Sequence, residues 1–339
     1  MIRAQPWRER KMALLDIIIT HAHEPWGIGR KMFEMLKVQR GIEEGDCRVI
    51  LVQDGPDDQL DLARIVRNYP FVETIVEQPK GGVSAVRNAG LEESDAEWIM
   101  FCDFDDCLYS VDSLFRIIQS IREAGDKADL LYSDFWIEQR TPDGRFTKVL
   151  KGWNTVFVHG KVYRREFLID HGIWFDEELT YSEDAMFNAL VAMEIDASRV
   201  AVMPEVVYMW CFRTESLSNY TGGDAARNMS LYKKRIKVCE EYEKRERLYD
   251  AKAAAARALL DYYWEMNGDV PMAGGTVEEW EERIRVFCRR WPKAMLEISA
   301  ADRKKLFEVT KEEAARKRLI HDGIRMPRPE DWLRRLGAI

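Results

Sequence analysis

Residues 78–106 read QPKGGVSAVRNAGLEESDAEWIMFCDFDD, and this stretch decides the fold. Its apolar run WIMFC contains no polar residue, which is typical of a strand that is covered on both faces. Three aspartates, Asp103, Asp105 and Asp106, follow the run directly, and a segment of helical pattern at 84–93 precedes it. The stretch therefore predicts a helix, a buried strand and a group of carboxylates at the end of that strand.

The first two thirds of the chain repeat this alternation of short apolar runs and helical patterns. Runs such as DIIIT and RVILV lack the polar alternation of a sheet with one solvated face. The pattern predicts an α/β fold with a mainly parallel sheet, helices on both faces, and ligands beyond the carboxyl ends of the strands. The predicted strands are residues 14–19, 48–52, 74–76, 98–102 and 130–135, and the predicted helices are residues 27–39, 58–68, 84–93 and 111–124.

The pattern changes after residue 136. The turn residues TPDG at 141–144 predict a hairpin, and from Asp224 onward the strands give way to long segments of good helix formers. We therefore expect an α/β domain over residues 1–222 and a helical C-terminal domain over residues 223–339. Further predicted helices lie at residues 164–171, from 182 onward, at 276–288 and at 301–319, and further strands lie at 200–202 and 206–210.

The composition is that of a globular protein without a membrane span. The chain has 339 residues, 46% of them hydrophobic, and no run reaches the roughly 18 apolar residues that a transmembrane helix needs. The start MIRAQPWRERK lacks the apolar segment of a secretory signal, so we expect a cytoplasmic protein. Six scattered cysteines show no metal-ligand spacing, and Cys102 and Cys107 are interpreted as buried thiols.

The formal net charge of −8 is unevenly distributed. The part after residue 230 carries 25 basic and 20 acidic side chains. This excess favours an anionic partner, although charges of both signs on helices are more typical of solvated helix faces. The same helices offer surfaces for oligomerisation.

Polar side chains follow several of the predicted strands. His21 and His23 come after the first strand, Asp54 comes after the second, and Asp103 and Asp105 come after the fourth. Two carboxylates separated by one residue can bind a hard divalent cation, and Mn²⁺ or Mg²⁺ fits oxygen ligands. The alternative is a solvated acidic turn or a cap of the following helix.

The order of motifs in residues 78–106 resembles a known family. Arg87, Asn88 and Gly90 form an Arg-Asn-x-Gly element between the glycine pair and the apolar strand. This order resembles the nucleotide-sugar-binding half of family 2 glycosyltransferases with the GT-A fold, in which such an element runs into the strand that ends at a D-x-D metal site. The resemblance extends over about residues 13–220 and implies a Rossmann-like nucleotide-diphospho-sugar transferase sheet.

Two earlier segments carry the same resemblance. DIIITHAHEP at 16–25 stands where the family has its first strand and nucleotide-contacting loop, and VILVQDGPDD at 49–58 is similar to the second strand with its Asp-Asp-Gly element. Gln53 replaces the first aspartate of that element, whereas Asp54 is kept. The resemblance implies that His21 and Asp54 contact the nucleotide, with uridine as the expected base.

The segment SEDAMFNALVAM at 182–193 resembles the start of the family's acceptor-side helix, which makes Asp184 the expected catalytic base and Glu183 a donor-binding residue. Ser182 independently predicts a helix N-cap with two acidic residues in the first turn, and capping alone would also explain the pair. YMWCFRTESLSN at 208–219 resembles the family's closing segment. Arg213 is either a diphosphate clamp or an exposed charge at a strand end.

The resemblance implies an inverting displacement at the anomeric carbon of a nucleotide sugar, with transfer of a hexosyl or N-acetylhexosaminyl group. Asp184 would take the proton of the acceptor hydroxyl. A metal held by Asp105 and Asp103 would stabilise the leaving diphosphate. Arg87 and Arg213 would add positive charge near that group.

The acceptor is the least determined part of the prediction. Trp136, Trp153 and Trp174 lie in the segment that should border it, but tryptophans there are equally suited to a core. The acceptor is left open among a glycan, a surface polymer and hydroxymethylated DNA. His159 and His171 lack ligand spacing to another histidine, and both are interpreted as structural.

Two other classes of function fit parts of the sequence. Because Gln53 and Ala22 depart from the family pattern, a binding module without turnover is one alternative. A metal-dependent nucleotidyltransferase is another, since it also gathers aspartates on an α/β sheet. A dinucleotide-binding enzyme is disfavoured, because no G-x-G-x-x-G element follows the first strand.

Overall fold

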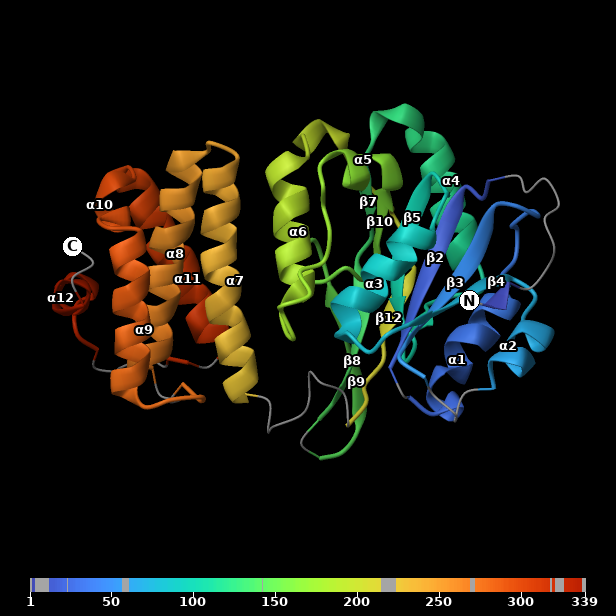
Figure 1. The fold of residues 1–339 in the computed structure, drawn as a ribbon, viewed down its shortest axis with the longest axis horizontal. Coiled ribbons are helices and arrows are strands. Elements are labelled where there is room, and N and C mark those ends of the chain that lie inside the picture. Colours follow the sequence, from blue (N-terminus) through green and yellow to red (C-terminus); the bar gives the residue numbers. More distant parts are fainter. Residues whose placement is uncertain are drawn as a thin grey trace. The chain divides into compact units, whose positions relative to one another are not determined.

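The computed structural model describes residues 2–3, 12–22, 24–56, 61–141, 143–214, 224–268, 272–317, 319–320 and 326–336. His23 and the serines at 216 and 218 lie outside these ranges. The chain forms two compact units, Met1–Tyr220 and Thr221–Ile339. Figure 1 shows the strands in the first unit and helices alone in the second. The division into two functional domains stays a prediction.

The first unit is built on an eight-stranded sheet in which strands distant in sequence are neighbours. Its central strands run parallel, and the strand next to them, β10, runs antiparallel to β5. The order across the sheet is β1 (Ile2–Arg3), β4 (Val72–Gln78), β3 (Cys47–Asp54), β2 (Leu15–His21), β5 (Trp98–Asp103), β10 (Lys161–Arg164), β7 (Leu130–Tyr132) and β11 (Val200–Val202). The predicted α/β sheet is therefore present.

Helices cover both faces of this sheet because its central strands are apolar on both sides. Every residue of β2 is buried. Ile17 and Ile19 belong to the core formed with α1 (Trp26–Lys37) and α4 (Ser113–Ala124). On the opposite face, α3 (Gly82–Glu93) packs on β2, β3 and β4 (Figure 1). The unit also contains α2 (Leu62–Asn68), α5 (Arg165–Asp170) and α6 (Glu183–Glu194).

Gly90 explains part of the Arg-Asn-x-Gly element. A Cβ atom at this position would lie 2.3 Å from Ile18 Cγ2 on β2. Since real Cβ atoms do not approach other carbons so closely, only glycine allows α3 to lie this near the sheet. The element thus fixes the distance between the helix that carries Arg87 and the strands beneath it.

A second, four-stranded sheet has the order β6 (Cys107–Leu108), β12 (Tyr208–Trp210), β8 (Phe135–Arg140) and β9 (Phe146–Lys151). The hairpin predicted around TPDG is confirmed as β8 and β9. The single strand predicted at 130–135 is wrong, because it divides into β7 and β8 on different sheets. The chain leaves one sheet and enters the other at this division, where Ser133 N donates to Gly160 O.

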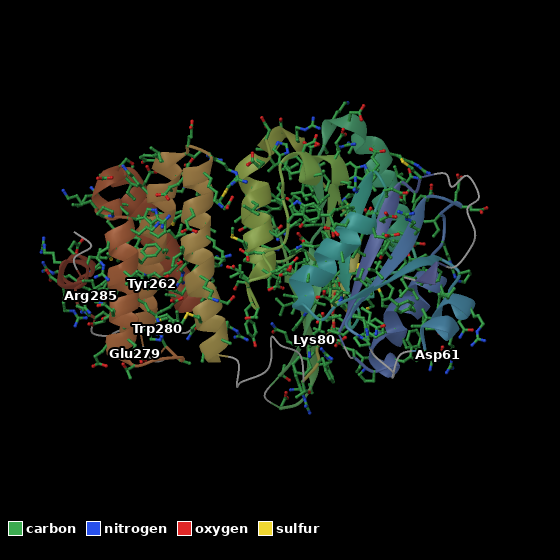
Figure 2. The ribbon with its side chains drawn as sticks, viewed as in Figure 1. Asp61, Lys80, Tyr262, Glu279, Trp280 and Arg285 are labelled. Carbon is green, nitrogen blue, oxygen red and sulfur yellow. The ribbon has the colours of Figure 1, made fainter. Side chains whose placement is uncertain are left out.

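The second unit consists of helices around a core rich in aromatic side chains. Tyr262 and Trp280, labelled in Figure 2, are fully buried. Thr276 and Glu279 form a reciprocal capping box at the start of α9 (Val277–Arg290), as a Thr followed three residues later by a Glu predicts. None of the described helices is long and apolar enough to cross a membrane. The helices are α7 (Asp224–Lys244), α8 (Leu248–Asn267), α9 (Val277–Arg290), α10 (Ala294–Glu297), α11 (Ala300–Arg316) and α12 (Pro329–Arg335).

Candidate active site

The polar residues predicted at one edge of the sheet do meet there. Strands β3, β2 and β5 are neighbours, and their register places Thr20 opposite Asp103 and His21 opposite Gln53. Thr20 Oγ1 donates to Asp103 Oδ1 at 3.1 Å. Since all three strands are parallel, their carboxyl ends form a single rim. Asp103, His21 and Asp54 are thus brought to that rim, as the sequence predicts.

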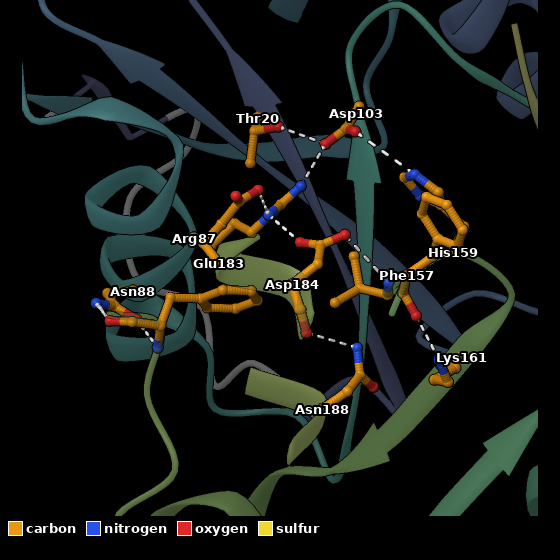
Figure 3. A network of polar contacts seen from close by, with 12 residues as sticks. Thr20, Arg87, Asn88, Asp103, Phe157, His159, Lys161, Glu183, Asp184 and Asn188 are labelled. Carbon is orange, nitrogen blue, oxygen red and sulfur yellow. Dashed lines mark hydrogen bonds and ion pairs between the residues drawn. The ribbon is translucent and has the colours of Figure 1, made fainter. Parts of the chain in front are cut away.

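Arg87 lies at the centre of the site and joins residues from three parts of the chain (Figure 3). Its Nη2 is 3.0 Å from Asp103 Oδ1 at the end of β5. Its Nη1 contacts Glu183 Oε1 at 3.1 Å and also donates to Asp184 Oδ1. The guanidinium is almost fully buried and stacks on Phe175, with 5.1 Å from Cζ to the ring centroid. One planar cation therefore holds the end of β5 and the start of α6 together.

The charges in this group are strongly coupled. Burial by itself raises the pKa of Asp103, but Arg87 and His159 outweigh it and hold the pKa below its usual value. Burial alone would lower the pKa of Arg87, and the three carboxylates raise it instead. Asp103 and Arg87 are therefore both charged at neutral pH. The arrangement thus joins one guanidinium to three carboxyl groups.

Asp184 occupies the first turn of α6, directly after Glu183. Its second oxygen, Oδ2, accepts from Val158 N at 3.2 Å. The predicted N-cap at Ser182 is present in position, but its side chain makes no capping hydrogen bond and its backbone has a positive φ of 63°. The side-chain cap predicted at Ser182 is therefore not formed, whereas both acidic residues do lie in the first turn, with their carboxylates toward Arg87. A non-glycine residue with positive φ costs roughly 1 kcal/mol and is a common feature of functional sites.

Two further ionisable groups beside Asp184 have shifted pKa values. Burial, with repulsion from Asp184, raises the pKa of Glu183 to about 7. Burial also lowers the pKa of Lys161 to about 8, against the attraction of Asp184. Lys161 Nζ donates to Phe157 O and lies 5.7 Å from the ring centroid of Trp153. Glu183 thus titrates in the neutral range, which suits a group that exchanges protons near a substrate.

Asn88 and Asn188 hold the two helices of the site in place. Asn88 Nδ2 donates to Phe175 O at 2.9 Å, and its Oδ1 accepts from Phe175 N at 2.9 Å. Asn188 Nδ2 donates to Asp184 O at 2.8 Å. The asparagine of the Arg-Asn-x-Gly element therefore fixes the loop before α6, a role that its sequence position did not reveal.

Asp105 lies apart from this group and pairs with the closing segment. Arg213 Nε is 3.0 Å from Asp105 Oδ2, and Arg213 Nη2 is 3.3 Å from Glu24 Oε1. Burial, with repulsion from Asp103, raises the pKa of Asp105 to about 6. Arg213 is thus a partly buried partner of the D-x-D element and not an isolated charge at a strand end.

Asp106 holds the segment around Tyr208 and Cys211 beside the site. It is fully buried, accepts from Tyr208 OH at 2.6 Å through Oδ2, and accepts from Cys211 N at 2.8 Å through Oδ1. Burial and the neighbouring aspartates raise its pKa well above the ordinary value. The N-cap of α4 is Asp112, so none of the three aspartates at 103, 105 and 106 caps the following helix.

His159 also reaches the site, which the sequence did not predict. Its Nε2 is 3.9 Å from Asp103 Oδ2, and its ring stacks on Tyr208 with centroids 5.0 Å apart. Its Nδ1 is buried and has no hydrogen-bond partner within the described part of the chain. His171 is different, since it ends α5 and its Nδ1 is 2.9 Å from Phe167 O, as a structural histidine would be.

The site contains a donor set that suits a divalent cation. Asp103, Asp106 and His159 each offer a ligand atom, and these atoms lie within 4.8 Å of one another. Carboxylates and an imidazole are ligands that Mn²⁺ accepts, and a cation here would share the Asp106 carboxyl group with Tyr208 OH and Cys211 N. The predicted pair was Asp103 and Asp105, and Asp105 lies outside this set. The Nε2 of His159 would bind a cation only in the tautomer that carries the ring proton on Nδ1, and this Nδ1 is buried.

Asp54 and His21 lie at the rim but engage neighbouring backbone. Asp54 Oδ1 accepts from Gly81 N at 2.7 Å, and its Oδ2 accepts from Gly82 N at 3.2 Å. These amides begin α3, where a carboxylate is favoured by the helix dipole. His21 is buried, and its Nε2 is 2.9 Å from Glu24 O. Both residues therefore shape the rim loops, while their predicted contact with a nucleotide stays a prediction.

The fold and the site together define a class of protein. Residues 16–176 match the family described as Glycosyl transferase family 2. This segment, just under half of the chain, is similar to glycosyl transferase family 2, and the sheet with its helical C-terminal region has the GT-A fold.

The chain is also similar to individual proteins described as glycosyltransferases. It is 26% identical over 51% of its length to a protein described as uncharacterized glycosyltransferase EpsJ of Bacillus subtilis, and 25% identical over 59% to uncharacterized glycosyltransferase YibD of Escherichia coli. These matches span 55% and 63% of the two relatives, so the chain corresponds to less than two thirds of each.

A solved structure extends the likeness over nearly the whole chain. The crystal structure of residues 1–349 of TarS from Staphylococcus aureus in complex with UDP-GlcNAc has a TM-score of 0.62 and 18% sequence identity. The likeness covers 93% of this chain and 97% of that one. At this identity the comparison establishes a shared fold.

Proposed function

We propose that the protein is an inverting glycosyltransferase that moves a sugar from a UDP-sugar to an acceptor hydroxyl, with Asp184 as general base. One observation carries this proposal. The guanidinium of Arg87 joins Asp103, at the end of the D-x-D strand, to Asp184, at the start of α6. Arg87 thereby holds the Asp184 carboxylate, which would face the acceptor, close to the Asp103 carboxylate, which would face the metal and the donor. A single displacement requires such a close arrangement of the two substrates.

The acceptor side of the site supports proton removal. Asp184 accepts hydrogen bonds from Arg87 and from Val158 N, which fix the orientation of its carboxylate. A fixed carboxylate within hydrogen-bond reach of a hydroxyl can take its proton as the new glycosidic bond forms. Glu183, whose pKa is raised to about 7, would offer a protonated carboxyl to the donor sugar below that pH. Asn188 holds the backbone of Asp184 in place during this step.

The donor side of the site supports departure of a diphosphate. Asp103, with Asp106 and His159, would hold Mn²⁺ or Mg²⁺, and Asp105 would join them if its pairing with Arg213 opens. When bound, the cation supplies positive charge to the leaving diphosphate. Arg213, once released from Asp105, would provide two guanidinium donors to phosphate oxygens.

The donor is assigned to the UDP-sugars. The TarS structure with this fold is described as a complex with UDP-GlcNAc, and another as a complex with UDP. His21 and Asp54 lie at the rim where the base and ribose would bind, although Asp54 now holds the start of α3. We assign transfer of a hexosyl or N-acetylhexosaminyl group, in the cytoplasm, and leave the acceptor and the oligomeric state open.

The donor and metal assignments are tested by titrating the protein with UDP, GDP and ADP, each with and without Mn²⁺, in a calorimeter. We expect UDP to bind at least tenfold more tightly than the other nucleotides, and only weakly when EDTA removes the metal. Asp103→Asn should lose the metal dependence, while Asp261→Asn in the helical unit should keep it. Equal affinity for all three nucleotides would contradict the donor assignment.

A further inference from the structure

The edge strand β9 and the segment that follows it expose an unusual group of apolar side chains. Phe146 is 63% exposed and Trp153 is 50% exposed. Five of the large exposed apolar side chains of the described chain fall within eleven consecutive residues, whereas such residues are normally scattered singly. We call this group the β9 edge surface, and its members are Phe146, Val149, Leu150, Trp153 and Val156.

The apolar side chains of β9 point to both sides of its sheet. The register pairs Leu150 with Trp136 and Val149 with Ile137 on β8. Because side chains alternate along a strand, Phe146 and Leu150 lie on one face and Val149 lies on the other. A protein partner that covers one face of the sheet would leave the other face exposed. A fluid interface, in contrast, surrounds an edge from both sides.

Basic side chains accompany the apolar ones. Residues 138–151 contain four basic and two acidic side chains, in a protein whose formal net charge is −8. Lys148 and Lys151 lie over aromatic rings at 5.7 Å and 5.9 Å, and neither has a carboxylate partner among the described residues. The two acidic side chains are engaged, since Glu138 accepts from Phe212 N and Asp143 pairs with Arg145.

We propose that the β9 edge surface docks on an anionic phospholipid bilayer. Aromatic and aliphatic side chains enter the boundary between headgroups and acyl chains, and neighbouring lysines bind lipid phosphates. The lysine stems lie along apolar surface while their ammonium groups reach the headgroups. A second copy of the chain fits less well, because pairing two β9 edges would bring the same lysines together.

The position of this surface gives docking a consequence for the reaction. The chain continues from Lys151 through Trp153 to Val158, whose N–H group donates to Asp184. A membrane-docked molecule would therefore hold the acceptor side of its site next to the lipid headgroups. Docking itself is independent of the proposed transfer, so either can fail without the other.

The test is flotation of the whole protein with vesicles of phosphatidylcholine alone and of phosphatidylcholine mixed with phosphatidylglycerol. We expect flotation with the anionic vesicles only, reduced at high salt. Leu150→Ser with Trp153→Ser should weaken binding at least about tenfold, because each side chain buries apolar area in the interface. Lys148→Gln with Lys151→Gln should weaken it by a similar factor.

Matched controls lie in the helical unit. Leu248 and Val286 are also exposed apolar side chains, and Lys304 and Lys305 are exposed lysines. Serine at the first two positions and glutamine at the other two should leave flotation unchanged. All variants change surface side chains, so their melting temperatures should stay near that of the wild type.

Three results would overturn the proposal. The first is an absence of flotation with anionic vesicles, and the second is equal flotation of the β9 variants and the wild type. The third is a concentration-dependent dimer that Leu150→Ser with Trp153→Ser abolishes, because it would assign the surface to self-association. Sedimentation velocity without vesicles measures that dimer.

Discussion

Replacement of Arg87 by methionine removes the one cation that holds three carboxylates together. Methionine keeps much of the length and apolar contact of the side chain, including the packing against Phe175. Asp103, Glu183 and Asp184 then lose their shared partner. Asp184 retains its hydrogen bond from Val158 N, so the helix start is weakened but not released.

The size of the effect follows from the burial of these groups. Removing one partner of a fully buried ion pair costs about 3–5 kcal/mol. The side chains of Glu183 and Asp184 are 14% exposed and that of Asp103 is 25% exposed, so water can partly replace the lost cation. We therefore expect the lower end of that range, about 3 kcal/mol at pH 7.5, which for a unit of this size is a fall in melting temperature of about 6–12 °C.

The assay combines scanning calorimetry with turnover of a UDP-sugar. The loss of stability should shrink at pH 5, because carboxylates without a cation can take up protons there. Turnover should fall by about 100-fold, since displacement of a catalytic group by about 1 Å has that effect. Arg87→Lys should recover part of the stability but little turnover, because one ammonium cannot replace the two-sided guanidinium.

The control is Arg235→Met in the helical unit. Arg235 is also buried and pairs with Glu265 at 2.7 Å and 2.9 Å. It should lose stability by a similar amount, through the same loss of a buried partner, but keep the wild-type affinity for UDP. A loss below about 1 kcal/mol in Arg87→Met, or a loss that does not depend on pH, would refute the reasoning.

Three further substitutions, at Glu183, Gly90 and Asp106, should each change the stability of the protein. Because the folded protein keeps a proton on Glu183 up to about pH 7 while the unfolded chain releases it near 4.5, stability falls as pH rises through this window. Glu183→Gln should abolish this fall in the free energy of unfolding, which amounts to about 3 kcal/mol in urea melts with EDTA. The reasoning is contradicted if the stabilities of the variant and the wild type change with pH in parallel. Gly90→Ala should cost about 1–3 kcal/mol in the same melts, because its Cβ meets Ile18, and an unchanged midpoint would refute the packing argument. Asp106→Asn should cost about 1–3 kcal/mol, because an NH2 donor replaces one of the two oxygens that accept from Tyr208 OH and Cys211 N. An unchanged midpoint would show that these two hydrogen bonds do not stabilise the fold.

The sheet was predictable because its signals are local. Uninterrupted apolar runs define β2, β3 and β5, and the carboxyl ends of parallel strands must share one edge. This placed His21, Asp54 and Asp103 on one rim from the sequence alone. The resemblance carried by the Arg-Asn-x-Gly element added Arg87, and the structure then shows that Gly90 lets its helix lie close to the strands.

The remaining contacts depend on pairings between distant segments. His159 reaches Asp103 only because β10 joins the sheet antiparallel to β5, and its short strand has no clear sequence pattern. Asp106 meets Tyr208 through pairing of β6 with β12, each of two or three residues. The hydrogen bonds from the first amides of α3 to Asp54 likewise depend on the orientation of the Asp54 side chain, which sequence spacing does not determine.

The central claim is that Asp184 is the base in transfer from a UDP-sugar, and Asp184→Asn tests it most directly. The measurement is release of UDP from UDP-GlcNAc with Mn²⁺, together with the affinity of each protein for UDP. The account predicts that the variant binds UDP within about threefold of the wild type while its turnover falls at least about 100-fold. Turnover at the wild-type rate with unchanged UDP affinity would contradict it.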